Sequence, residues 1–311
     1  MRYRAKLLAI LEDFVAHAPC QPGRGRAAEF LFDKHTAANR LLALTAIYFG
    51  LARRGDLDQS GALAASLRAR IGALGRFFAE EAHFESHNNH GFAESTALLL
   101  AAVMFPDWDE SDRWLAIARR RFESLVSRLI GTDGVFIENS PFYHFYVYQQ
   151  LRNVVAWARR YGIALPENVP KRTSQMIDFL GAIVHPDGTL PPLAISSRNS
   201  LRRQLTETID AVSAEDPVAA WLISGGAAGQ PPPPRPRHFG DSGLIVLRSY
   251  APTPKAFAGS AHLVLDAGPA RTSRPHLDVG NLVLWGGGRM LLNEAGSYSL
   301  EPSVWYDYFY G

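Results

Sequence analysis

The stretch Gly225-Gly226-Ala227-Ala228-Gly229-Gln230-Pro231-Pro232-Pro233-Pro234-Arg235-Pro236 separates two parts of the chain that differ in composition. Glycine leaves the backbone free and consecutive prolines favour an extended polyproline conformation, so this stretch predicts a linker. We therefore expect a multidomain α and β protein. It would have an α-helical domain over residues 1–224, a linker over 225–237 and a β domain over 238–311.

Before the linker, apolar residues recur at three- and four-residue spacings, with abundant Ala, Leu and Arg. This pattern is typical of amphipathic helices, and the short connections between them favour antiparallel helix pairs. The predicted helices cover residues 6–16, 37–53, 60–82, 92–104, 110–129, 143–161, 169–183, 202–212 and 218–223.

After the linker, short β-branched and aliphatic segments alternate with Gly and Pro turns. They predict strands at residues 243–249, 262–266, 281–285 and 289–293, with Gly286-Gly287-Gly288 as a hairpin turn. Four or five strands would leave an open sheet edge. We therefore expect the second domain to be truncated, and to be completed by further chain or by a partner.

Composition excludes several classes of protein. The 311 residues are 47% hydrophobic and 20% charged, and 32 Lys+Arg against 30 Asp+Glu give a net charge of +2. Such a balance is typical of a globular protein and provides no global field for nucleic acid. The single Cys20 excludes an internal disulfide. No apolar run approaches the ~20 residues of a membrane span, and Glu12 and Asp13 interrupt the only stretch that imitates a signal peptide.

A dense polar segment, Glu85-Ser86-His87-Asn88-Asn89-His90-Gly91, lies just before an apolar helix. It predicts either an elaborate helix cap or part of a functional site. In the first interpretation Asn88 or Asn89 is the N-cap and Glu94 completes a capping box. In the second, Asn89 and His90 face a cleft while His87 and Asn88 shape the turn.

Two further segments combine polar and aromatic residues. In the first, Glu138-Asn139-Ser140-Pro141-Phe142-Tyr143-His144 follows Asp133-Gly134, and Pro141 predicts the first turn of a helix. The second comprises Arg274-Pro275-His276-Leu277-Asp278 and Leu292-Asn293-Glu294-Ala295-Gly296-Ser297-Tyr298 in the β domain.

In this order, the three segments resemble the heparinase II/III-like polysaccharide lyases, which include relatives acting on alginate. The resemblance covers roughly residue 33 to the end of the chain. It implies an incomplete (α/α) toroid followed by an antiparallel β-sandwich, and cleavage of an anionic, uronic-acid-containing polysaccharide by β-elimination. It also implies a periplasmic or secreted protein; because no signal peptide is seen, a cytoplasmic one stays an alternative. A homo-oligomer is also left open.

The resemblance assigns three catalytic roles. Asn89 would neutralise the uronate carboxylate, His90 would act as a base or as a second neutralising group, and Tyr143 would be the base or acid at the glycosidic oxygen. The structural alternatives are that Asn89 only caps the helix and that Tyr143 only packs.

Five residues are expected to bind the substrate: Arg274, His144, Glu138, His35 and Arg40. Arg274 stands where the family has a histidine, so it could neutralise a carboxylate but could not act as a base. His144 is equally suited to a position behind the catalytic residues. Near His35, Thr36 as an N-cap explains the local pattern as well.

A structural zinc is the one metal that the resemblance suggests, and no cofactor is required. His276 and Glu294 are acceptable ligands, with Glu294 in the place of the family's aspartate. Two ligands do not make a tetrahedral site, and no later histidine follows in this chain.

Two other functions are kept. A glycoside hydrolase on a helical toroid would need two opposed carboxylates, and Glu85, Glu94, Asp107 and Glu138 offer no convincing pair. A non-catalytic polysaccharide-binding or exopolysaccharide-assembly protein would keep the cleft without turnover, and Arg274 favours it. The sequence leaves the polymer and the endo or exo mode open.

Overall fold

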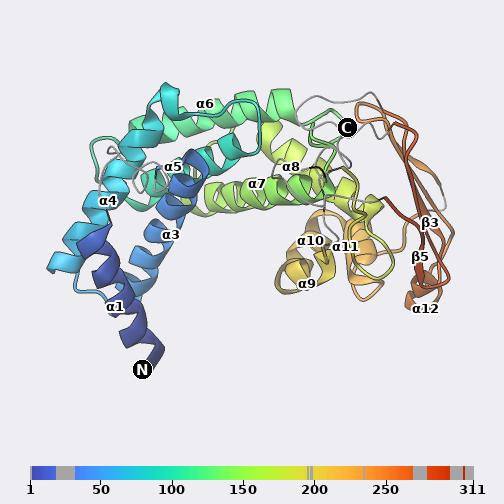
Figure 1. Cartoon of the computed structure of the whole chain (residues 1–311), viewed down its shortest axis with the longest axis horizontal. Helices are drawn as coiled ribbons and strands as arrows, with labels where there is room; N and C mark the ends of the chain where they lie inside the picture. The colour runs from blue at the N-terminus through green and yellow to red at the C-terminus, as the bar shows by residue number, and fades with distance from the viewer. Residues whose placement is uncertain are drawn as a thin grey trace. The chain divides into compact units, whose positions relative to one another are not determined.

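A computed structural model describes residues 2–18, 32–194, 196, 199–233, 235–268, 279–294 and 304. A mostly helical region is followed by a five-stranded antiparallel sheet (Figure 1). The chain forms two compact units, Met1–Leu125 with Asn153–Pro166, and Val126–Arg152 with Glu167–Gly311. The sheet thus shares a unit with helices that precede the Gly/Pro-rich stretch.

The first unit is built from amphipathic helices whose apolar faces are buried together. Its elements are α1 (Arg2–His17), α3 (Lys34–Arg53), α4 (Ala62–Ala79), the short 3-10 helix η1 (Glu81–His83) and α5 (His90–Met104). In Figure 1, α3 lies beside α5, and α4 contacts both. Almost all of α5 is buried, which explains why its sequence is apolar on every side.

Two long helices, α6 (Ser111–Leu129) and α7 (Pro141–Tyr161), contribute residues to both units. All of the helices predicted before residue 200 are present, with ends shifted by a few residues. The alternative in which Thr36 is the N-cap of α3 is wrong. The N-cap is Asp33, whose Oδ1 accepts a hydrogen bond from the Thr36 N–H at 2.9 Å, so Thr36 lies inside the helix.

The second unit contains a helical layer followed by the sheet. Its helices are α8 (Asn168–Ile183), α9 (Leu201–Leu205), η2 (Thr206–Thr208), α10 (Ile209–Glu215), α11 (Pro217–Ser224) and, between two strands, α12 (Pro254–Ala258). A single helix was predicted over residues 202–212, and the structure breaks it into α9, η2 and α10. Gly181 allows α8 and α11 to approach closely, because a Cβ there would lie 2.6 Å from Ala219 Cα.

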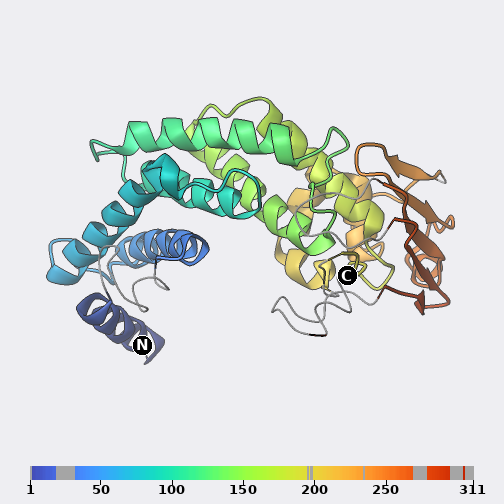
Figure 2. The same cartoon turned by 45° about the horizontal axis from the view of Figure 1, so that its top comes forward.

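The sheet is a simple antiparallel meander. Its strands are β1 (Arg237–Phe239), β2 (Leu244–Arg248), β3 (His262–Asp266), β4 (Leu282–Gly286) and β5 (Arg289–Leu292), hydrogen-bonded in that order (Figure 2). Four strands and the final hairpin were predicted correctly. Gly287 and Gly288 have φ of 57° and 76°, the left-handed pair that a type I′ turn requires. β1 was missed. Its first residue, Arg237, ends the predicted linker, and His238 and Phe239 precede the first predicted strand.

Both faces of the sheet are aliphatic. On the inner face Val246, Val264 and Val283 are paired and buried, and the Phe239 ring packs edge-on against Phe179 of α8, with centroids 4.9 Å apart. On the outer face Leu247, Leu263, Leu284 and Leu292 form a paired row across four strands. Leu247 and Leu292 at the ends of this row are 42% and 49% exposed.

Among the helices that the structure describes, none combines the length and the apolar composition of a membrane span.

Candidate functional site

In the first unit, the polar segment forms the entry to α5. Asn89 is at the N-cap position but has helical φ and ψ, and its side chain makes no capping bond. Asn88 caps instead, because its Oδ1 accepts a hydrogen bond from the His90 N–H at 2.8 Å. The predicted capping box is wrong: Glu94 Oε2 accepts from the Glu85 N–H at 2.9 Å.

Glu85 organises the side chains of this turn. Its Oε2 accepts from Asn88 Nδ2 at 2.8 Å and lies 3.1 Å from His90 Nδ1. The ring of His90 packs at a tilt against His35 of α3, with centroids 4.6 Å apart. His35 and His90, predicted from distant parts of the sequence, are therefore neighbours.

The two glutamates of this turn have opposite electrostatic character. Burial raises the pKa of Glu85, but the Asn88 hydrogen bond and the charges of His90 and Lys34 outweigh it, so the pKa lies below its ordinary value. For Glu94 burial dominates and raises the pKa to about 7, against the opposing hydrogen bond from Glu85. At neutral pH Glu85 is ionised, whereas Glu94 titrates close to neutrality.

Asn89 and His90 offer complementary chemistry. Asn89 is 5% exposed, and its amide makes no hydrogen bond to any residue in the described part of the chain. In a neutral His90 ring whose Nδ1–H donates to Glu85, the lone pair is on Nε2. The turn can therefore donate a hydrogen bond to an anion and accept a proton.

Two predicted substrate-binding residues lie on α3. Burial lowers the pKa of His35, and the nearby charge of His90 lowers it further. Burial also lowers the pKa of Arg40, whose guanidinium carbon lies 5.9 Å from the centroid of the Phe32 ring. Both groups are half-buried in the unit that holds His90.

In the second unit, Tyr143 is in the first turn of α7. Asn139 takes a left-handed conformation with φ of 52°, and α7 begins at Pro141 as the sequence predicted. Ser140 Oγ accepts a hydrogen bond from the Tyr143 N–H at 3.3 Å, and the Phe142 and Tyr143 rings are 5.2 Å apart. Tyr143 is half-buried, as is Glu138 in the loop before it.

His144 is a structural residue in this arrangement. It is 1% exposed, its Nδ1 accepts from the Phe136 N–H at 3.2 Å, and its Nε2 lies 3.1 Å from the carbonyl oxygen of Met176. Burial lowers its pKa to about 3, so the ring stays neutral. No ring nitrogen is left for a ligand, and this geometry does not support the predicted substrate contact.

The remaining predicted residues belong to the β domain. Arg274 and His276 lie outside the described residues. Glu294 Oε2 accepts a hydrogen bond from the Ala194 N–H at 3.2 Å. Within the described ranges, no group of three or more His, Cys, Asp or Glu is placed to hold a metal ion.

Sequence reasoning missed the roles of Glu85 and Glu94. It considered both as carboxylates for a hydrolase, and Glu94 also as the residue that completes a capping box. Glu94 carried a detectable signal, since a glutamate between Phe92-Ala93 and the apolar run of the same helix predicts a buried carboxyl group. The contact between Glu85 and His90 depends on the turn that joins them.

Two family profiles match consecutive parts of the chain: "Heparinase II/III N-terminus" over residues 2–219 and "Heparinase II/III-like, C-terminal" over residues 231–311. Among curated proteins, a heparin-sulfate lyase of Bacteroides stercoris is 22% identical over 219 residues, which are 69% of this chain and 32% of that protein. One from Pedobacter heparinus is 23% identical over 221 residues, 70% of this chain and 33% of that protein.

Solved structures show the same fold. A crystal structure of heparinase III matches with a TM-score of 0.78 at 16% identity, covering 100% of this chain and 50% of that one. A mutant heparan sulfate lyase from Pedobacter heparinus matches with a TM-score of 0.76 at 18% identity, covering 99% and 48%. The chain thus spans about a third of the length of these curated relatives and about half of these solved chains.

Proposed function

Because the chain belongs to the heparinase II/III family, we propose that it is a polysaccharide lyase that cleaves a uronic-acid-containing polysaccharide by β-elimination. The observation that carries the proposal is the turn before α5. There a buried Asn89 with an uncommitted amide is next to His90, whose Nδ1 contacts the ionised Glu85.

The reaction needs three groups. A base removes the proton from C5 of the uronate, and the electron pair of that bond forms the C4–C5 double bond. The bond between C4 and the glycosidic oxygen breaks, and an acid protonates the departing oxygen. The C5 proton is acidic enough only if donors neutralise the carboxylate on the same carbon.

The residues of this chain supply these groups as follows. The Asn89 amide donates to the uronate carboxylate, and His90 Nε2 accepts the C5 proton. Glu85 keeps the His90 proton on Nδ1 and stabilises the imidazolium that forms. The Tyr143 hydroxyl protonates the departing oxygen. Arg40 and Arg274 bind acidic groups of neighbouring sugars.

The names of the relatives set the order in which polymers should be tested. Curated proteins at 22% and 23% identity are named heparin-sulfate lyases, so heparan sulfate is the first polymer to test. Alginate and bacterial exopolysaccharides are the second choice, because the family resemblance includes alginate-cleaving relatives. Zinc binding by His276 and Glu294, and a periplasmic or secreted location, stay predictions.

The experiment is a panel of heparan sulfate, hyaluronan, alginate and bacterial exopolysaccharides incubated with the protein. A lyase produces an unsaturated uronate that absorbs in the far ultraviolet, together with one new reducing end for each bond cleaved. New reducing ends without this absorbance would identify a hydrolase instead. Binding of a polymer without either product would favour the non-catalytic alternative.

A further inference from the structure

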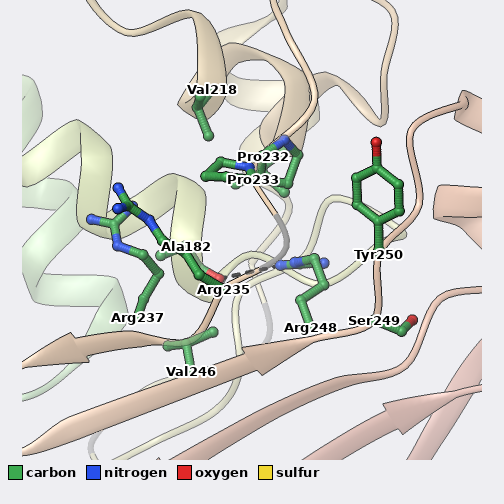
Figure 3. A pocket seen from close by; sticks show the side chains of 11 residues that line it. Ala182, Val218, Pro232, Pro233, Arg235, Arg237, Val246, Arg248, Ser249 and Tyr250 are labelled. Carbon is green, nitrogen blue, oxygen red and sulfur yellow. Dashed lines mark hydrogen bonds between the residues drawn. The ribbon is translucent and has the colours of Figure 1, made fainter.

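The second unit contains a small cavity between the Pro232–Pro233 segment, α11 and strands β1 and β2. Its lining includes Val218, Pro233, Arg237, Val246, Arg248 and Tyr250 (Figure 3). Its volume is about 40 Å³, measured for the centre of a water-sized sphere. A single water needs roughly 10–15 Å³ by this measure, so the cavity has room for a small ion but not for a sugar ring.

Arg248 brings a charge into this cavity. Its Nη2 donates to the carbonyl oxygens of Val184, at 2.6 Å, and of Ala182, at 3.2 Å. The guanidinium carbon lies 5.1 Å from the centroid of the Phe257 ring. In Figure 3 the guanidinium lies in the middle of the view, with Tyr250 on one side and Arg237 on the other.

The charge of Arg248 has no counter-ion within the described residues. Its buried Nη1 makes no hydrogen bond to any of them. His262 of β3, which pairs with Arg248 in the sheet, is buried, and burial together with the charge of Arg248 keeps its pKa well below the ordinary value, so it is neutral. Burial lowers the pKa of Arg248 to about 9, which still leaves the guanidinium protonated at neutral pH.

Arg237, on the neighbouring strand β1, differs from Arg248 because its charge is paired with a carboxylate. Its two terminal nitrogens bind both carboxylate oxygens of Asp178, the Nη1 bond being 2.9 Å long. This bidentate pair compensates the charge of Arg237. Arg235, which also lines the cavity, is exposed to solvent. The cavity is therefore electropositive. Of its three arginines, Arg248 is the one that is neither paired with a carboxylate nor exposed to solvent.

We infer that this cavity binds one small oxyanion, of the size of sulfate or of a carboxylate group, beside the guanidinium of Arg248. A buried guanidinium without a carboxylate is costly, and an anion that it can reach removes this cost. The planar donor edge of arginine matches the oxygens of sulfate and carboxylate. This inference is independent of the proposed lyase activity, because it uses neither His90 nor Tyr143.

The test is thermal unfolding of the full chain with sodium sulfate or sodium acetate, each against sodium chloride at equal ionic strength. A specific ligand raises Tm in a way that follows site occupancy, whereas general salting-out grows with concentration. We expect a rise in Tm that follows site occupancy in the native protein. This rise should be lost in Arg248→Met. The matched control Arg289→Met, at an exposed position on β5, should keep it.

A rise for acetate alone would identify a carboxylate as the ligand, and a rise for sulfate alone a tetrahedral anion. The inference is overturned if neither anion gives that rise, or if Arg248→Met responds like the native protein. A crystal of the native protein soaked in selenate gives an answer that does not depend on a variant. An anomalous peak in the cavity within hydrogen-bond distance of a guanidinium nitrogen of Arg248 supports the inference, and a water in that place overturns it.

Discussion

Glu85 Oε2 lies 3.1 Å from His90 Nδ1, and the same oxygen accepts a hydrogen bond from Asn88 Nδ2 at 2.8 Å. The carboxylate is thereby fixed by one residue of the turn and orients another. This relationship gives the proposed base a defined tautomer, and it leads to the first prediction.

His90→Ala should lower kcat/KM by about 10²–10⁴-fold, the usual contribution of a positioned base. Glu85→Gln should cause a smaller loss, because glutamine can still accept from Nδ1 but does not stabilise an imidazolium. The steady-state rate of far-ultraviolet product formation measures both. The α5 cap survives in His90→Ala, since Asn88 bonds to a backbone N–H. Full activity of His90→Ala would remove His90 from the mechanism.

Tyr143→Phe should reduce turnover by about 10²–10⁴-fold while polysaccharide binding is kept. The substitution removes only the hydroxyl that would protonate the leaving oxygen. The matched control is Tyr161→Phe, the same change at the exposed far end of α7. Single-turnover rates and binding by calorimetry separate the two effects. Equal losses in both variants would mean that α7, rather than the Tyr143 hydroxyl, is affected.

Glu94 should make the protein less stable as pH rises. The folded pKa of about 7 lies above the ordinary 4.5, so the folded state binds more protons between these values. The free energy of unfolding should fall by up to about 3 kcal/mol from pH 4.5 to above pH 7. Glu94→Gln should remove this part of the slope, whereas the exposed Glu12→Gln should not. Urea unfolding at several pH values measures it, and parallel curves for Glu94→Gln and the native protein would refute it.

His144 should make the protein less stable as pH falls, which is the opposite of the effect of Glu94. Its folded pKa of about 3 lies below the ordinary 6.5, so the unfolded state binds its proton first as pH falls. The free energy of unfolding should drop by up to about 5 kcal/mol between pH 6.5 and pH 3.

His144→Phe should show a shallower acid slope. At neutral pH it should also be less stable by about 2 kcal/mol, because Phe136 N–H and Met176 C=O lose their partner. The control is His238→Gln, at an exposed position in the same unit. Circular dichroism during acid titration measures the slope, and an unchanged slope in His144→Phe would contradict the assignment.

Gly91→Ala should destabilise the protein by about 1–3 kcal/mol, since a Cβ at this position would overlap the carbonyl oxygen of Glu85. The shift of Glu85 should also lower activity. Gly50→Ala, in the exposed part of α3 with open space around it, should instead be neutral or stabilising by about 1 kcal/mol. Melting temperatures of the two variants measure the difference, and a Gly91→Ala protein as stable as Gly50→Ala would contradict it.

The helices and four of the strands could be predicted because their patterns are local. Residues 262–266 alternate buried and half-buried side chains, and the strand was predicted to the residue. β1 could not be predicted, since a three-residue strand after prolines carries no period and forms only by pairing with β2. The apolar pattern of residues 202–212 predicted one helix, but tertiary contacts of its short segments decide the breaks.

The sequence allowed the candidate site residues to be named, but it predicted only some of their contacts in the structure. Asn89 and His90 were chosen by the family resemblance, which includes their place at the head of an apolar helix, and α5 does begin at His90. Their catalytic roles stay predictions. The partner of Glu94 was predicted from the usual local spacing of a capping box, yet the turn brings the Glu85 N–H to it instead. Burial of His144 depends on α8, which follows far along the chain.

The two aliphatic faces of the sheet have a consequence for strand pairing. A shift of one residue exchanges the faces of a strand, and in β2, β3 and β4 it would replace one set of aliphatic side chains by another. Hydrophobicity therefore discriminates little between the native pairing and its neighbours. The discrimination falls to the two inner rows that are not wholly aliphatic. In one, Phe239 and Asp266 flank Leu244, and in the other Arg248, His262 and Trp285 are paired across three strands. A shifted strand would move the Arg248 guanidinium away from the carbonyl groups at the end of α8. The contacts of this row therefore favour the native register.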